Sequence, residues 1–187
     1  MAILFDLRSS ELPESRLSLS DGQASRQQMQ HHKIGYDLRL AEASDWEDVL
    51  RMSKDFHSES PYRKVPFSEG RVREIFDQYL FSDKTEIMVL LLLYGEEVCG
   101  TIVSICSKFP FSEEKAASEL IWWVDHEHRS RRGSLSLFRA YEFWCQKIGA
   151  RYSSAVSTEG TVQLDKFYER SGYKKAETTY IKQIKES

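Results

Sequence analysis

The chain has 187 residues, 41% of them hydrophobic, and a formal net charge of −3. This length suits one domain, or one domain with a tail, and the hydrophobic fraction is enough to build a sizeable core. A slightly acidic chain has no overall attraction to nucleic acid or to an anionic membrane, so any anion-binding site must be local.

The sequence lacks the marks of export, membrane insertion and metal binding. Its N-terminus has no basic region or cleavage site, and the longest apolar run, Ile87–Tyr94, is too short to span a bilayer. The cysteines Cys99, Cys106 and Cys145 are odd in number and lack metal-ligand spacing, which indicates buried free thiols. We therefore expect a soluble, cytoplasmic protein with no bound metal and no membrane contact.

Residues 1 to 35 differ from the rest of the chain in composition. They are rich in Ser and Gln, have few large apolar residues after Leu7, and carry opposite charges that cancel. Such a stretch buries too little apolar surface to offset its ordering entropy. We predict a flexible polar arm over residues 1–35 and a globular domain over residues 36–187.

The first half of the domain predicts a strand, two helices and a hairpin. Alternation indicates a strand over 36–43, and Ser44 with Glu47 forms a capping box for a helix over 44–60. Ser68 caps a second helix over 69–81. Two apolar runs, 86–94 and 97–109, are joined by Gly95-Glu96 and predict a β-hairpin. The inward helix positions are Trp46, Val49, Leu50, Met52 and Phe56, then Val72, Ile75, Phe76, Tyr79 and Leu80.

The second half continues the alternation of strands and helices. A strand over 117–125 leads through a basic turn into a helix that ends at Gly149, with Leu137, Tyr141, Trp144 and Ile148 on its inner side. Residues 151–158 predict a strand, 161–172 a short helix and 178–184 a last strand. This order indicates an α/β (α+β) fold with a mixed sheet.

The basic turn gives the strongest local indication of function. A helix N-terminus has backbone N–H groups without intrahelical partners, and its dipole favours an anion. Arg129, Arg131 and Arg132 add charge, and Gly133 with Ser134 lets a ligand approach the backbone. From these residues alone, a solvated turn without a ligand is an equally good interpretation. Neither a P-loop nor a dinucleotide-binding fingerprint is present.

Two motifs in this order of elements resemble the GNAT superfamily of acyl-CoA-dependent N-acyltransferases. The turn from Val124 to Ser134 matches the family pattern V-x-P-x-x-R-G-x-G-x-G/A, and "FYERSGYKK" (Phe167–Lys175) matches the later (L/F)Y-E-(R/K)-x-G-(F/Y). The resemblance covers residues 36 to 184, and "RAYEFW" (Arg139–Trp144) is similar to a small branch often encoded by phages. It implies a GNAT-like, mostly antiparallel mixed sheet flanked by helices.

The turn departs from the family pattern at several positions. His126 stands where Pro is common, Ser130 and Arg132 where Gly is usual, and Ser134 where Gly or Ala is usual. The glycine at 133 is one position off the family register. Arg132 would either add a phosphate contact or crowd the loop.

The resemblance implies acetyl-CoA as cosubstrate, with its pyrophosphate on residues 129–134. Backbone amides at the end of the preceding strand would bind the pantetheine arm or polarise the thioester carbonyl. The implied cofactor-binding residues are Trp123, Val124, Arg129, Ser130, Arg131, Arg132, Gly133 and Ser134.

Two side chains are candidates for proton transfer. The resemblance implies that Glu119 is the base for the attacking amine and that Tyr168 protonates the departing thiolate. Each residue also has a plainer interpretation. Glu119 would be a strand-end carboxylate facing water or a lysine, and Tyr168 a core tyrosine whose hydroxyl is satisfied.

The expected reaction is direct attack of an amine on acetyl-CoA in a ternary complex. The acceptor, a small molecule or a protein, would approach from the side of the first two helices and their connection at 58–66, and a homodimer is left open. An alternative from another class is a catalytically inactive GNAT-fold module, of viral origin, that binds a protein partner. Nucleic-acid binding through "RSRR" (Arg129–Arg132) is a weaker alternative.

Overall fold

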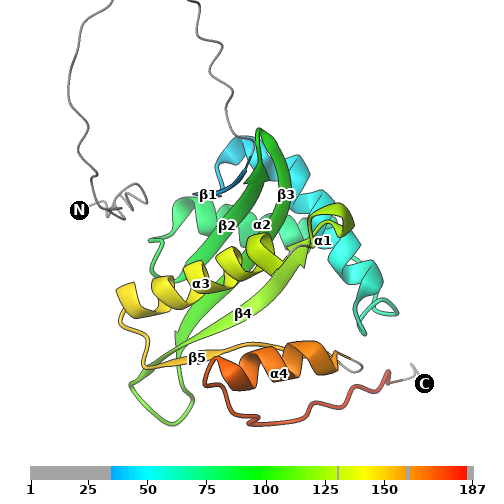
Figure 1. Cartoon of the computed structure of the whole chain (residues 1–187). Coiled ribbons are helices and arrows are strands. Elements are labelled where there is room, and N and C mark those ends of the chain that lie inside the picture. The colour runs from blue at the N-terminus through cyan, green and yellow to red at the C-terminus, as the bar shows by residue number, and fades with distance from the viewer. Residues whose placement is uncertain (1–34, 130, 159–160, 185–187) are drawn as a thin grey trace, which may run out of the picture. The chain divides into compact units, whose positions relative to one another are not determined.

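The computed structural model describes residues 35–129, 131–158 and 161–184, which form the sheet and helices in Figure 1. The expected polar arm lies outside the described residues, apart from Gly35. In chain order the elements are β1 (Tyr36–Leu40), η1 (Ala43–Asp45), α1 (Trp46–Glu59), α2 (Glu69–Phe81), β2 (Ile87–Tyr94), β3 (Glu97–Lys108), β4 (Lys115–Val124), η2 (His126–His128), α3 (Arg131–Lys147), β5 (Tyr152–Ser154) and α4 (Val162–Arg170).

The five strands form one sheet in the order β1-β2-β3-β4-β5. The first four strands pair antiparallel with their neighbours, and β5 pairs parallel with β4. This topology confirms the mixed, mostly antiparallel sheet expected from the sequence. The β2–β3 hairpin turns at Gly95, whose φ of 65° is the left-handed conformation that glycine adopts without strain.

Helices cover both faces of the sheet (Figure 1). On one face α1 and α2 bury a core that includes Val49, Met52, Phe76 and Tyr79. On the other face α3 buries the side chains that its periodicity predicted, which are Leu137, Tyr141, Trp144 and Ile148. Burying large side chains of this kind contributes about 1.5–3 kcal/mol each, so these two layers hold the sheet in place.

The start of α1 differs from the predicted capping box. The helix begins at Trp46 after the short helix η1, and Asp45 rather than Ser44 organises this end. The buried Asp45 carboxylate accepts the Glu42 N–H at 2.7 Å and binds Arg39 through contacts of 2.6 and 2.7 Å. A bidentate contact between charged groups is stronger than a hydrogen bond to a neutral hydroxyl. This explains why Asp45 and not Ser44 organises the start of α1. The predicted cap of α2 is confirmed, because Ser68 Oγ accepts the Arg71 N–H at 3.2 Å.

The two predicted strands near the C-terminus are the least accurate part of the sequence analysis. The strand expected over 151–158 is limited to β5, and the one expected over 178–184 does not form. Side chains of that segment, including Tyr180 and Ile184, are exposed. A strand needs a partner for its backbone groups as well as a suitable pattern, and these residues have no pairing with a described strand. No helix among the described residues is long and apolar enough to cross a membrane.

Candidate active site

The edge of β4 that faces β5 is paired over only part of its length. Residues Ala116–Ser118 of β4 lie opposite Tyr152–Ser154, and β4 then continues to Val124. Figure 1 shows the two strands diverging beyond the paired part. Within the described residues no strand pairs with this edge of β4 after Ser118. The backbone N–H and C=O groups that point away from β3 here, apart from the Val124 carbonyl oxygen that accepts from Arg129, are therefore available to an extended ligand that adds to the edge.

A β-bulge in β4 decides which side chains face this opening. In the β3–β4 register Ile121 lies opposite Val103 and Glu119 lies opposite Ser104, so Leu120 is an extra residue. Simple alternation would place Glu119 on the α1–α2 face together with Ile121 and Trp123. The bulge instead brings Glu119 to the α3–α4 face, where it meets Tyr168 of α4.

Glu119 and Tyr168, predicted separately as base and acid, lie in contact. The Tyr168 hydroxyl donates toward Glu119 Oε2 at 3.4 Å and toward the Val156 carbonyl oxygen at 3.2 Å. The Val156 N–H donates to the same carboxylate oxygen at 3.3 Å. Both side chains are buried, with 5% of Glu119 and 7% of Tyr168 exposed. The plainer interpretation of Glu119 as a carboxylate facing water is therefore wrong.

The environment of this pair changes the acidity of both groups. Burial raises the pKa of Glu119 to about 7, against the opposing effect of hydrogen bonds from Val156 N–H and Tyr168. Burial and the neighbouring Glu119 charge also raise the pKa of Tyr168. A carboxylate with a pKa near neutrality is suited to accept a proton from an amine, and a protonated phenol can donate one.

Aromatic rings surround the pair on the α3–α4 face. Trp122 stacks on Phe138 with a centroid distance of 5.0 Å and lies 6.1 Å from Phe167 and 6.4 Å from Tyr168. Tyr173 is 5.7 Å from Tyr168. The neighbouring Trp123 packs into the core under α1 and α2, so the two tryptophans point to opposite faces of the sheet. Burial of the Glu119 carboxyl beside this aromatic cluster is the cause of its raised pKa.

At the far end of β4, Arg129 of the basic turn makes three contacts within the protein. Its Nε donates to the Val124 carbonyl oxygen at 2.8 Å, and its Nη2 binds Glu59 Oε2 at 3.0 Å. The guanidinium carbon also lies 4.5 Å from the ring centroid of Trp123. Arg129 therefore places a positive charge where the open edge of β4 meets the start of α3.

The other predicted residues of the turn have different positions. Ser130 lies outside the described residues, Arg131 is the first residue of α3, Arg132 is exposed and Ser134 is partly buried. Gly133 is buried, and a Cβ on it would meet Leu92 Cδ2 at 3.0 Å and Tyr36 Cε1 at 3.2 Å. The missing side chain thus lets the first turn of α3 pack closely on the sheet. Contact of this glycine with a ligand stays a prediction.

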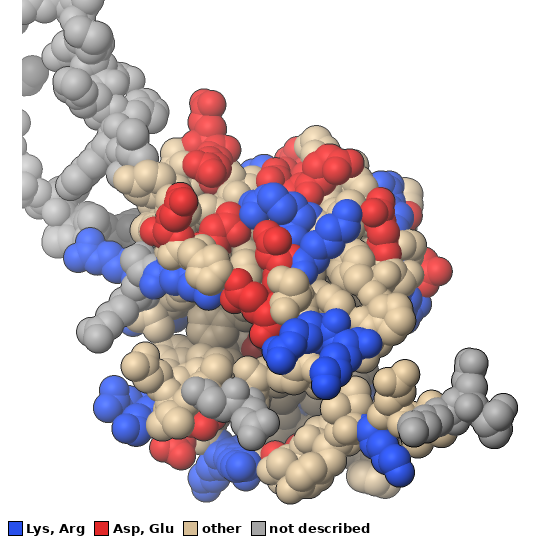
Figure 2. All heavy atoms as spheres, turned by 90° about the vertical axis from the view of Figure 1, so that its right-hand side faces the viewer, with Lys and Arg blue, Asp and Glu red and all other residues tan. Residues whose placement is uncertain are grey.

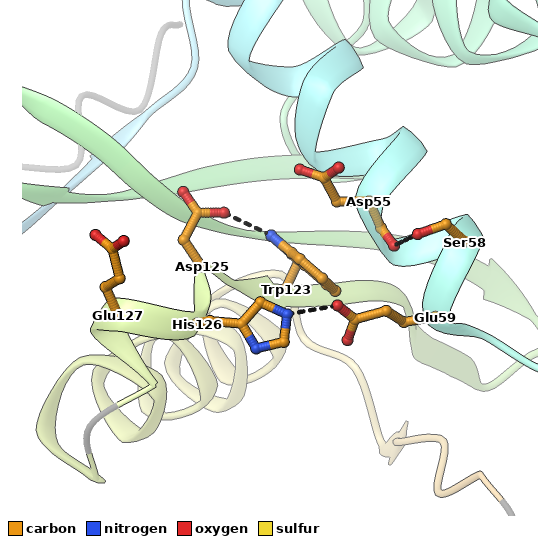
Figure 3. Close-up of a pocket in the computed structure, with 7 residues that line it drawn as sticks. All are labelled: Asp55, Ser58, Glu59, Trp123, Asp125, His126 and Glu127. Atoms are coloured by element: carbon orange, nitrogen blue, oxygen red, sulfur yellow. Dashed lines mark hydrogen bonds and ion pairs between the residues drawn. The ribbon is translucent and has the colours of Figure 1, made fainter.

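A cavity of about 370 Å³ lies beside Arg129, between the end of α1 and the end of β4 (Figure 3). Its Asp125 carboxylate accepts hydrogen bonds from Trp123 Nε1 at 2.8 Å and Arg51 at 3.0 Å. His126 Nε2 lies 2.6 Å from Glu59 Oε1. The cavity is lined by Asp55, Ser58, Glu59, Trp123, Asp125, His126 and Glu127, of which four are carboxylates.

Sequence reasoning identified only part of this cavity. Ser58 and Glu59 begin the connection that was expected to face the acceptor, whereas Asp125 and His126 were not assigned a role. The Glu59–His126 contact joins residues 67 positions apart, and no local pattern could have indicated it.

Figure 2 shows the face of the protein on which α1 ends and the turn after β4 lies. The surface is hollowed across its middle, with Lys and Arg side chains on both sides of the hollow and most of the Asp and Glu side chains above it. In the described part of the chain, no group of three or more His, Cys, Asp or Glu side chains is arranged to hold a metal ion.

The comparisons with known proteins agree with this architecture. The sequence matches the Acetyltransferase (GNAT) family over residues 46–173. No curated protein matches it.

Solved structures with the same fold include proteins described as having different functions. An aminoglycoside N-acetyltransferase, AAC(6')-Iy, solved with the bisubstrate analog CoA-S-monomethyl-acetylneamine, has a TM-score of 0.64 and 12% identity, covering 81% of this chain and 99% of its own. A ribosomal-protein-alanine N-acetyltransferase from Brucella melitensis biovar Abortus 2308 has a TM-score of 0.61 and 12% identity, covering 81% of this chain and 100% of its own. A transcriptional regulator from Bacillus halodurans C-125 has a TM-score of 0.65 and 14% identity, covering 80% of this chain and 100% of its own.

A mixed sheet that opens between two parallel strands, with a helix following the longer one, defines a domain of the GNAT fold. The chain belongs to the GNAT family of acetyltransferases, because the family match spans more than half of its length.

The residues present fit an acyl-CoA in two respects. The free edge of β4 beyond Ser118 offers backbone donors and acceptors to an extended arm. Arg129, at the end of that edge, supplies a cation of the kind that binds pyrophosphate through paired N–H groups.

Proposed function

We propose that this chain is an N-acetyltransferase that moves an acetyl group from acetyl-CoA to an amine in a ternary complex. The observation that carries the proposal is the buried contact between Glu119 and Tyr168 beside the open edge of β4. The similarity of "RAYEFW" to the small phage-type branch supports a place for the chain in that branch.

Acetyl-CoA, when bound, supplies an acetyl group activated as a thioester. The amine nitrogen forms a bond to the acetyl carbon as the carbon–sulfur bond breaks. Glu119 accepts the proton that the nitrogen loses, and Tyr168 donates its proton to the sulfur that leaves. The Val124 N–H, on the open edge of β4, holds the arm and polarises the carbonyl. The Trp123 N–H faces β3 instead, since N–H groups two residues apart on a strand point the same way and the Asp125 N–H donates to the Cys99 carbonyl oxygen at 2.9 Å.

The contact between the two groups also restores them after each turnover. Glu119 ends the step protonated and Tyr168 ends it as a phenolate, with 3.4 Å between their oxygens. Burial raises the pKa of Tyr168 further above that of Glu119, so the proton moves downhill from the carboxyl to the phenolate. The pair then needs no proton from bulk water to begin again.

The acceptor side of the site suits an amine that arrives as a cation. The cavity beside Arg129 is lined by four carboxylates, and the two arginines that pair with them, Arg51 and Arg129, leave it with a net negative charge that attracts an ammonium ion. Its position at the end of α1 agrees with the approach expected for the acceptor. An ammonium ion must release one proton to water before it attacks, because Glu119 accepts the further proton that the neutral amine loses on forming the amide.

Calorimetric titration with acetyl-CoA and with CoA tests the cofactor half of the proposal. Wild-type protein should bind with micromolar affinity, and Arg129→Ala should weaken binding at least tenfold. Arg71→Ala is the matched control, because it removes the same charge from an exposed position on α2 where the arginine pairs with Glu74. If neither ligand binds, the inactive GNAT-fold module becomes the better account.

A screen of amine acceptors tests the catalytic half. The release of free CoA thiol should accompany acetylation of the acceptor one for one, and Glu119→Gln should slow both equally. Acetyl-CoA binding without transfer to any amine, protein N-terminus or lysine would contradict the proposed activity.

A further inference from the structure

The arginine expected to bind the cofactor is already engaged within the protein. Arg129 contacts the Val124 carbonyl oxygen, the Glu59 carboxylate and the Trp123 ring. The Val124 carbonyl belongs to the last residue of β4, at the end of its open edge. In this position the arginine covers the end of the edge to which an extended ligand would add.

Glu59 is the residue that holds Arg129 there by charge. It is the last residue of α1, and its two oxygens contact Arg129 at 3.0 Å and His126 at 2.6 Å. Although desolvation acts in the opposite direction, hydrogen bonds from Arg129 and His126 hold the pKa of Glu59 below its usual value. The carboxylate is therefore ionised at neutral pH, and it offers the guanidinium the same kind of anionic oxygen as a pyrophosphate does.

We propose that Glu59 is a positioning residue that competes with the pyrophosphate of acyl-CoA for Arg129. This inference rests on the proposed function. In the free protein Glu59 holds the guanidinium against Val124 and Trp123, and on cofactor binding the arginine exchanges the carboxylate for the pyrophosphate. The strength of the Glu59–Arg129 contact thus sets part of the cofactor affinity.

The exchange also connects the cofactor side with the acceptor side of the site. Glu59 lines the cavity beside Trp123 and Asp125, so its carboxylate loses its partner there when Arg129 moves to the pyrophosphate. The cavity then carries more net negative charge than in the free protein. If an acceptor binds through that charge, bound cofactor raises the affinity for the acceptor, and bound acceptor raises the affinity for the cofactor by the same factor.

The test is calorimetric titration of CoA into wild-type protein, Glu59→Gln and Asp55→Asn. Glu59 is partly exposed, so its contact with Arg129 is of the modest strength typical of surface ion pairs, and we expect Glu59→Gln to bind CoA about two- to fivefold more tightly. Asp55 lies one helical turn earlier, lines the same cavity and pairs with Arg51 at 3.6 Å. Asp55→Asn removes the same charge without touching Arg129, so it should change the affinity less.

Three further measurements test direct competition against a general effect of charge. In an Arg129→Ala background, Glu59→Gln should no longer raise the affinity for CoA. With 3′-dephospho-CoA, which keeps the pyrophosphate, the gain from Glu59→Gln should equal that seen with CoA. Steady-state kinetics should show a lower KM for acetyl-CoA without a higher kcat.

Three results would overturn the inference while leaving the proposed function intact. They are CoA affinity in Glu59→Gln equal to that of wild type, an equal gain in Asp55→Asn, and a gain that persists without Arg129. Failure of every variant to bind CoA would overturn the proposed function, and the inference with it.

Discussion

The hydroxyl oxygen of Tyr168 lies 3.4 Å from Glu119 Oε2, although the two residues are 49 positions apart in the chain. A bulge in β4 and the last turn of α4 are both needed to bring them together. Because the two groups are in contact, replacing either one should change the pKa of the other.

Activity should depend on pH through the ionisation of Glu119. Burial raises the pKa of this carboxyl to about 7, and only the deprotonated form can accept the proton of the amine. We expect the rate constant of the chemical step to rise with pH, to reach half its maximum near pH 7 and to level off above that. A pre-steady-state pH profile measures this.

Glu119→Gln should remove that rise and lower the rate about 10²- to 10⁴-fold, which is the usual contribution of a positioned base. A profile of unchanged shape in Glu119→Gln would show that another group is the base.

Tyr168→Phe should lower the rate and also shift the pH profile. The Tyr168 hydrogen bond lowers the pKa of Glu119, so its loss should move the inflection above the wild-type position. Tyr173→Phe is the matched control. Its hydroxyl belongs to the same aromatic cluster but lies 3.0 Å from Ser153 Oγ. It should leave the inflection in place, and an equal shift in both variants would contradict a direct Tyr168–Glu119 contact.

The parts of this structure that local patterns specify could be predicted from the sequence. The inner side of α3, the cap at Ser68 and the hairpin at Gly95 depend on residues a few positions apart, and all three are confirmed. The motif resemblance likewise identified the family. It also selected Glu119 and Tyr168, which the structure places in contact.

The parts that depend on distant partners could not be predicted. Glu59 reaches Arg129 across 70 positions, and neither residue type carries a signal for the other. The predicted strand over 178–184 was wrong, because an alternation of residue types does not tell whether another strand lies close enough to pair with it. No sequence pattern indicated the bulge at Leu120, although it decides which face of the sheet Glu119 occupies.

Stability should fall, relative to Glu119→Gln, as the pH rises from about 4.5 to about 7. The folded-state pKa of Glu119 is about 7, above its ordinary value of 4.5, so folding favours the neutral carboxyl. This contribution is fully present below the unfolded pKa and is lost as the pH rises through the folded pKa.

The difference of 2.5 pKa units corresponds to about 3 kcal/mol in the free energy of unfolding. Urea unfolding of both proteins at several pH values measures it. Parallel curves for wild type and Glu119→Gln over this range would show that Glu119 is not desolvated in the folded state.

Gly133→Ala should destabilise the protein and weaken cofactor binding together. The added Cβ would meet Leu92 Cδ2 at 3.0 Å and Tyr36 Cε1 at 3.2 Å, so these buried contacts must loosen and the first turn of α3 shifts relative to the sheet. Overpacking of this kind costs about 1–3 kcal/mol. The same movement displaces the helix start that follows Arg129, so CoA should bind more weakly in a titration.

Gly70→Ala in the first turn of α2 provides the comparison. Its Cβ would have only Ser68 Oγ near it, at 4.0 Å, so the gain in helix propensity should leave stability unchanged or higher. Chemical denaturation of the two variants separates steric crowding at Gly133 from the general effect of replacing a helical glycine. Equal stability of Gly133→Ala and wild type would mean that α3 does not pack on Leu92 and Tyr36 as closely as the structure shows.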